Sequence, residues 1–427
     1  MITRTPAPVP VPAEEWTASR LGWVQALAPV LNGLGAMVLT AGLGLWAAGA
    51  GDLPDGAFPR VVAATVVTAV GGAVELTGDA GDLAGAAGGL TVMPLSVTLV
   101  GALVTGASFL RPLRHRAGAT GTAGWAARVA LLWLLGLGGL AFAARRTFAV
   151  PLGGGTLADI GAALGAAPKV GFRADVPLTL LVGLLWLAGV LLLALLVSRG
   201  VPLPARPARL QESVRPAAYA MVVLLLAFVA LGTVTGLVVA VTGGEPTRSL
   251  ALVLLGLPNL VWLALTLGLG ATWEGRVDGP FGLPMPHVLD QVLRADETAT
   301  LNLSTLSGHD GRVWWLLVAD AVLLPAAAFL MAARSPARVR AWRHAVHMAV
   351  AVALTVLMIL LTGRISVHYG LSVLGIGDLG GNLSGGLFLR PRLWGALGLA
   401  LPWGLVTGFL GAVAAGRVLR RGEAGDR

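Results

Sequence analysis

The residues of this 427-residue chain with the clearest chemical potential are polar groups inside apolar stretches. Asp320 lies between Trp314 and Pro325 in an otherwise apolar run. A carboxylate inside a membrane span costs about 3 kcal/mol on insertion scales and marks a candidate binding site. The alternative interpretation is that Asp320 lies at interfacial depth and pairs with a neighbouring arginine or hydroxyl. The sequence therefore predicts either a buried functional carboxylate or a structural ion pair.

A second polar group follows a proline in the apolar run 250–271. Pro258 removes a backbone donor, and the amide of Asn259 can bond the groups that this sets free. Broken membrane helices form the binding sites of many transporters. We expect Asn259 and Asp320 to face one cavity between two halves of the protein. The alternative role for Asn259 is local repair of the interrupted backbone.

Two glycine-rich stretches each carry an acid and an arginine. Asp159 follows Arg146, and Asp378 follows Arg364, in segments assigned to the outer side of a membrane. We interpret these residues as two equivalent ion pairs that tie segments together, with substrate binding as the alternative.

Metal and cofactor chemistry finds little support in the sequence. His344 and His347 have helical spacing for a metal, but no carboxylate or cysteine accompanies them and Arg343 repels a cation. The chain has no cysteine, which excludes thiol nucleophiles and thiolate metal sites. No serine-hydrolase, zinc-protease or phosphate-loop motif is present. We predict no metal, no cofactor and no catalytic residue.

The composition requires a membrane environment for these groups. Hydrophobic residues make up 56% of the chain and the mean hydropathy is +0.82. Several apolar runs reach the length of about 20 residues that spans hydrocarbon. The runs are continuous rather than alternating, which excludes a barrel. The predicted fold is all-α: a polytopic transmembrane helix bundle of about 8–10 membrane segments.

Arginine clusters fix the predicted threading. They lie at 111–116, 199–215, 334–343 and 417–421. The positive-inside rule places all four clusters, and both termini, on the cytoplasmic side of a bacterial plasma membrane. The net charge of +9 is thus topological and predicts no nucleic-acid partner. This threading requires that segments 61–76 and 250–271 do not change sides. We expect the second to be broken or re-entrant near Gly256–Asn259, or paired with a further crossing.

The order of segments repeats along the chain. Residues 1–20 form a proline-rich tail predicted to be disordered, 21–200 a first transmembrane half, and 201–427 a second half with a long extracytoplasmic loop at 273–312. Inward spans end in related text, SFLRPLRHR at 108–116 and AFLMAARSPAR at 328–338. Because both halves have the same orientation, the repeat is parallel.

The second half carries a family resemblance. Pro258-Asn259, GPFGLPMPHVLD at 279–290, DGRVWWLLVADAVLL at 310–324 and HYGLSVLGIGDLGG at 368–381 resemble the streptophobe family of hydrophobic actinobacterial membrane proteins. The resemblance implies a plasma-membrane protein of about ten segments. It brings no agreed activity and no catalytic residue.

Three functions fit these features, and the sequence favours them in the order transporter, scaffold, enzyme. A transporter or permease-like protein fits the repeat, the proline-broken segment and Asp320. A non-catalytic scaffold subunit of a membrane complex fits the glycine-rich helix faces. An enzyme acting on lipid-linked substrates at the outer face would use acids such as Asp52 and Asp55, which read more simply as turn residues. The expected partners are the lipid bilayer and an unknown small-molecule substrate or membrane protein.

Overall fold

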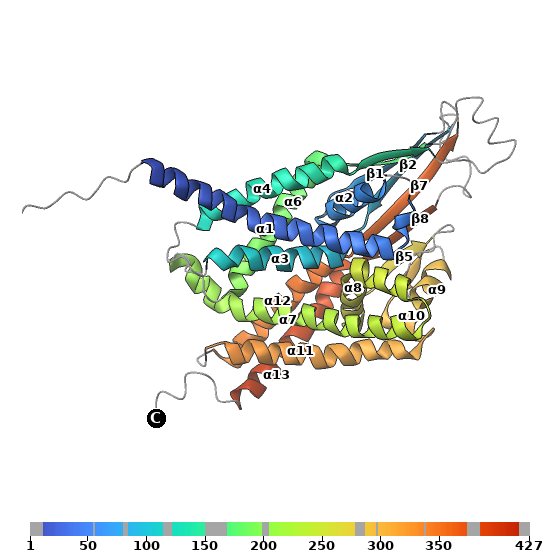
Figure 1. Ribbon diagram of the computed structural model, residues 1–427. Helices are drawn as coiled ribbons and strands as arrows, with labels where there is room; N and C mark the ends of the chain where they lie inside the picture. The colour runs from blue at the N-terminus through green and yellow to red at the C-terminus, as the bar shows by residue number, and fades with distance from the viewer. Residues whose placement is uncertain are drawn as a thin grey trace, which may run out of the picture.

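The computed structural model describes residues 12–53, 56–79, 84–113, 122–149, 169–198, 205–277, 287–295, 298–336, 339–373 and 385–417. Helices dominate, and the long ones run side by side between two ends of a bundle (Figure 1). In chain order, the helices of the first half are α1 (Pro12–Ala47), η1 (Ala50–Asp52), α2 (Phe58–Ala69), α3 (Leu95–Leu113), α4 (Thr122–Ala143) and α6 (Val176–Val197). Those of the second half are α7 (Ala205–Thr242), α8 (Pro246–Gly268), α9 (His287–Ala295), α10 (Leu303–Ser307), η3 (Gly311–Trp314), α11 (Trp315–Arg334), α12 (Ala341–Thr362) and α13 (Leu393–Gly416).

An antiparallel sheet of eight strands lies at one end of the bundle, which the sequence analysis did not predict (Figure 1). Its strands come from the segments expected to be outer loops. They are β1 (Val74–Asp79), β2 (Ala84–Thr91), β3 (Arg145–Ala149), β4 (Lys169–Ala174), β5 (Trp273–Val277), β6 (Ala299–Leu301), β7 (Ile365–Val373) and β8 (Gly385–Pro391). The bundle prediction is confirmed, and the sheet pairs backbone groups of connections that lie beyond the helices.

The two-fold repeat is visible in the sheet. The strand order is β3-β4-β1-β2-β7-β8-β5-β6, so the second four strands repeat the order of the first four. The halves meet where β2 pairs with β7, from Ala84↔Val373 to Thr91↔Ser366. Each half also has its own apolar core, one centred on α1, α3 and α4 and the other on α7, α8, α11, α12 and α13.

The register aligns the halves residue by residue. Val74 of β1 lies opposite Ala174, and Trp273 of β5 lies opposite Pro391, so Val74 and Trp273 are equivalent. Both follow a left-handed glycine by three residues: Gly71 at φ 92° and Gly270 at φ 93°. Only glycine adopts this conformation without strain, which explains the residue at each turn from helix to strand. The alignment also superposes Pro59, at the start of α2, on Pro258.

The segment around Pro258 is not broken. α8 is one helix from Pro246 to Gly268, and Pro258 lies inside it. The prediction of a break at Gly256–Asn259 was therefore wrong. The helix continues through the proline although Pro258 has no backbone N–H to donate. Where the first half begins α2 beside Pro59, the second half extends the equivalent helix by about three turns toward its N-terminus.

Both α2 and α8 begin and end near the sheet. α7 starts at the opposite end, where Tyr219 lies 3.7 Å from the guanidinium of Arg334 at the end of α11, and it finishes beside the start of α8. α8 then leads through Gly270 into β5 of the sheet. The arginine pattern predicted that this segment does not change sides, and α8 indeed does not connect the two ends of the bundle. Consequently α1 starts, and α13 finishes, at the end away from the sheet (Figure 1).

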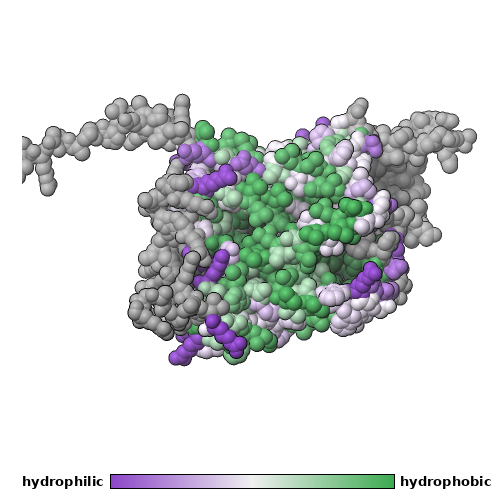
Figure 2. Space-filling model, turned by 60° about the horizontal axis from the view of Figure 1, so that its bottom comes forward, coloured by the Kyte–Doolittle hydropathy of each residue, from purple (hydrophilic) through white to green (hydrophobic). Residues whose placement is uncertain are grey.

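Nine of the described helices are long and apolar enough to cross a membrane, and α8 is one of them although it runs along the sheet end of the bundle. Figure 2 shows a wide apolar belt with hydrophilic residues collected at its sides. Exposed tryptophans mark both margins: Trp23 and Trp342 at one end, and Trp46, Trp315 and Trp394 at the other. Trp23 and Trp46 are separated by about 35 Å along α1, close to the thickness of a hydrocarbon core. The protein is a multi-pass integral membrane protein.

Two boundary assignments need detail. Residues 1–11 of the predicted tail lie outside the described residues, and α1 already includes 12–20, which the sequence analysis had assigned to that tail. The long loop 273–312 is not simply a loop, because it contains β5, α9, β6, α10 and the start of η3. The leucines of α9 and β6 could have indicated buried structure in this loop, although the apolar stretches that contain them are too short to span a membrane.

A labelling experiment tests the course of α8. Single cysteines at Thr247 and Thr272, introduced into this cysteine-free chain, should react with a membrane-impermeant maleimide from the same side of the membrane. A cysteine at Ala123, at the far end of the bundle, should react only from the other side. Labelling of Thr247→Cys and Thr272→Cys from opposite sides would mean that α8 crosses.

Candidate functional site

Asp320 is a fully buried carboxylate on α11, with no exposed surface. Neither carboxylate oxygen has a hydrogen-bond partner among the described residues. The carboxylate packs on the last turn of α8, where Gly268 leaves room for it. A Cβ added at Gly268 would overlap Oδ2 of Asp320 and lie 2.8 Å from the carbonyl oxygen of Leu316. Of the two interpretations offered by the sequence, the buried and unpaired carboxylate is the one observed.

The arrangement around Asp320 is unusual energetically. A buried polar group without a partner costs about 1–3 kcal/mol, and an ionised one costs more. The end of α8 adds no compensation, because a helix C-terminus carries partial negative charge. The nearby backbone donors of Leu269, Gly270 and Ala271 already bond carbonyls of α8. Such a group persists where function retains it, and Asp320 remains a candidate binding residue.

Asn259 holds the two halves together. Its side-chain oxygen accepts a hydrogen bond of 3.0 Å from the backbone N–H of Leu95, and its Nδ2 donates one of 2.9 Å to the carbonyl of Met93. Met93 lies between β2 and α3 of the first half, and Leu95 is the first residue of α3. A third bond, 2.8 Å from Ser96 Oγ to Val253 O, joins the same helices. Asn259 therefore bonds the other half of the protein rather than the backbone of its own helix.

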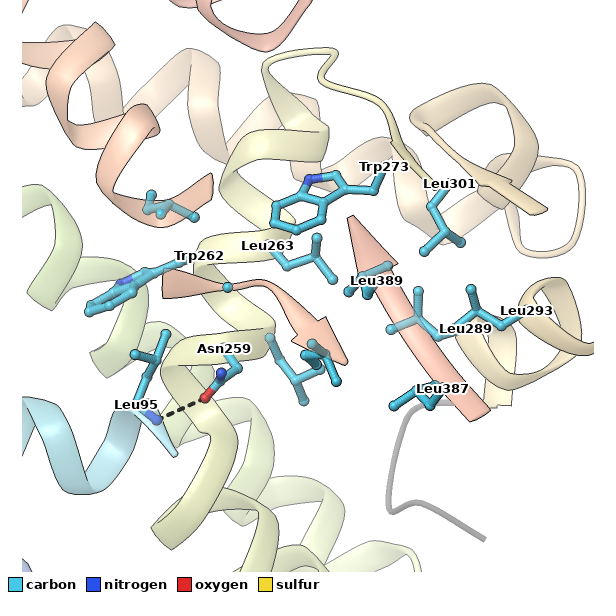
Figure 3. Close-up of a pocket in the computed structure, with 14 residues that line it drawn as sticks. Leu95, Asn259, Trp262, Leu263, Trp273, Leu289, Leu293, Leu301, Leu387 and Leu389 are labelled. Carbon is cyan, nitrogen blue, oxygen red and sulfur yellow. Dashed lines mark hydrogen bonds between the residues drawn. The ribbon is translucent and has the colours of Figure 1, made fainter. Parts of the chain in front are cut away.

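An apolar cavity of about 80 Å³ lies between α8 and the sheet. Asn259 lines it together with Trp262, Trp273 and leucines from α9, β6 and β8, as Figure 3 shows. The Trp273 indole donates its own hydrogen bond, 3.0 Å long, to Thr266 Oγ1 and so presents its ring to the cavity. Asp320 does not line this cavity. We expected one polar cavity shared by Asn259 and Asp320, whereas this cavity is apolar and only Asn259 lines it.

The outer ion pairs predicted from the sequence are only partly placed. Asp159 and Asp378 lie outside the described residues. Arg146 is on β3, and Arg364 is exposed one residue before β7. The sheet register corrects their equivalence: Arg145 lies opposite Arg173, which is equivalent to Arg390, so the counterpart of Arg364 is Arg145 rather than Arg146.

The histidines of α12 lie apart from these groups. His344 is buried and His347 is half-buried. Across the parts of the chain that the structure describes, no three His, Cys, Asp or Glu side chains gather as a metal site would require.

Sequence reasoning missed Gly268 and two rows of charged residues that the register places side by side on the sheet: Arg145, Arg173 and Glu75 in the first half, and Arg364, Arg390 and Glu274 in the second. Gly268 is one of 60 glycines, and only the packing distinguishes it. The rows had a readable signal, because Glu75 and Glu274 each follow a glycine of the same turn by four residues. Comparison of the chain with known protein families, curated proteins and solved structures finds no match.

The contact between Gly268 and Asp320 predicts a specific cost. Gly268→Ala should destabilise the protein by about 1–3 kcal/mol, because the new methyl group overlaps Oδ2 and the α11 backbone. Thermal unfolding of the purified protein in detergent measures this change. The matched control is Gly256→Ala on the same helix, where an added Cβ meets nothing within 4 Å. The control should be neutral or slightly stabilising, and equal losses in both variants would contradict the proposed contact.

Proposed function

We propose that this protein is a non-catalytic scaffold subunit of a plasma-membrane complex, with both termini in the cytoplasm and the sheet on the outer side. The arginine clusters near the ends of α3, α6, α11 and α13 support the orientation, because positively charged loops stay in the cytoplasm. The resemblance to the streptophobe family supports the choice of membrane and remains part of the proposal.

The observation that carries the scaffold function is the continuous sheet across the repeat boundary. Alternating access moves one half of a transporter against the other. Here eight residue pairs of β2 and β7 join the halves, and Asn259 adds two bonds beside them. Separating the halves would break many of these bonds together. A frame of this kind suits a protein that holds partners in place.

Tight helix packing in the second half agrees with this function. A Cβ added at Gly408 of α13 would lie 2.9 Å from Ala345 Cα, and one at Gly411 would meet the backbone of Ala328 and Phe329. Small residues at helix interfaces let membrane helices approach closely. They leave little room for a substrate path between α11, α12 and α13.

Spin-label distances test the scaffold against a moving transporter. Ala123→Cys and Ala414→Cys place labels on exposed positions of the two halves at the end away from the sheet. The expected result is one narrow distance distribution, matching the width of the within-half control pair Ala107→Cys and Ala123→Cys. Two populations in the cross-half pair alone would reject the scaffold and favour alternating access.

A transporter or permease-like function is the second candidate, and Asp320 is the observation that favours it. If Asp320 binds or relays a substrate ion, Asp320→Asn should keep insertion, abundance and melting temperature while abolishing ion-driven uptake by cells that express the protein. Asp320→Leu is the apolar counterpart. Full retention of uptake in both variants would assign Asp320 no role in transport.

A further inference from the structure

Charged residues form two equivalent rows across the sheet. In the first row, Arg145 of β3 lies opposite Arg173 of β4, which lies opposite Glu75 of β1. In the second row, Arg364 extends the β7 register to Arg390 of β8, which lies opposite Glu274 of β5. Residues directly opposite in a sheet share one face, with Cβ atoms about 5 Å apart. Each row therefore places two guanidinium groups beside one carboxylate.

The rows carry more positive charge than their acids neutralise. Arg145 and Arg173 make no ion pair with any described residue. In the second row, Glu274 accepts a 2.6 Å bond from Nε of a third arginine, Arg392. Like charges directly opposite each other on a sheet are destabilising. The same unfavourable pair occurs in both halves, which points to an anion that offsets it.

The depth of the rows indicates where this anion comes from. Arg145 follows the end of α4 by two residues, and Arg364 follows the end of α12 by two. Arg173 and Arg390 each precede a spanning helix by three residues. Trp394, next to the second row, is 87% exposed, as expected for a side chain among lipid headgroups. The rows thus lie at the level of lipid phosphates.

We propose that each arginine row binds the phosphate of an anionic phospholipid in the leaflet on the sheet side. The planar guanidinium fork matches phosphate oxygens, and two forks on adjacent strands offer several charge-assisted donors. The four arginines of the two rows are exposed, and the acyl chains lie along the adjoining apolar helices. This site explains why arginines recur on the side that the positive-inside rule leaves poor in them. It does not depend on the scaffold function.

Native mass spectrometry of the full-length protein in a neutral detergent tests the proposal. Phosphatidylglycerol is the probe, and diacylglycerol with the same chains is the phosphate-free comparison. The variants are Arg145→Gln/Arg173→Gln for the first row and Arg364→Gln/Arg390→Gln for the second. The matched control is Arg248→Gln/Arg312→Gln, which removes two exposed positive charges near the sheet outside both rows.

Each row variant should lose one tightly bound phosphatidylglycerol, because the affinity at that site should fall by about tenfold. The control variant should bind as the wild type does, and diacylglycerol should bind equally to all forms. Equal phosphatidylglycerol binding by row variants and control would overturn the proposal. Displacement of the lipid by inorganic phosphate, with phosphate itself bound at the rows, would overturn the lipid source in favour of a free anion.

Lysine variants keep the test decisive if the glutamine variants do not fold. Arg145→Lys/Arg173→Lys retains the charge and the exposed position but lacks the bidentate fork. Its affinity for phosphatidylglycerol should lie between those of the wild type and the glutamine variant. Wild-type affinity in this lysine variant would mean that the guanidinium fork does not hold the phosphate, and this result alone would overturn the site as proposed.

Discussion

The β2–β7 ladder is the interaction on which the rest of the structure depends. Two halves with separate cores each supply four strands, and this one pairing joins the strands into a single sheet. The bonds of Asn259 to Leu95 and Met93 join α8 to the segment that directly follows β2. The hydrogen bonds matter here because these connections would otherwise leave unpaired backbone groups near the membrane surface. The helices hold the protein in the membrane, and the sheet holds the two halves in one arrangement.

The sequence predicted the parts of the fold that lipid dictates. Hydrophobic run length identified the spanning helices, and the arginine clusters identified the two segments that stay on one side. The sheet escaped because β2 reads AGAAGGLT, which has neither the alternation nor the β-branched residues of a typical strand. Its pairing is set by tertiary context. The continuity of α8 escaped for a related reason: Pro258 signals a break locally, whereas the helix continues through it and packs on the first half.

The candidate site was predicted in its members but not in their relations. Asp320 and Asn259 were singled out because polar groups in apolar runs are costly, and both are indeed placed where packing is specific. Asn259 and Asp320 do not share a cavity because each contacts partners that are distant in the sequence, which no local pattern could predict. The backbone at Met93 and Leu95 occupies the amide of Asn259, and Gly268 accommodates the carboxylate of Asp320. Pairs such as Arg145 and Arg173 required the register, since 27 residues of chain lie between them.

The N-terminal extension of α8 makes the contact between halves one-directional. α8 packs on α1 and α3 of the first half, whereas its shorter counterpart α2 does not pack comparably on α7 or α11. The junction is therefore head-to-tail: one surface of the first half meets a different surface of the second. Duplication of an ancestral gene would supply two like halves, but a closed twofold pair of such halves would need every contact made twice. The longer α8, by contrast, makes a single contact that has no counterpart in the first half. The covalent linkage between α6 and α7 then fixes the stoichiometry that a free pair of halves would lack.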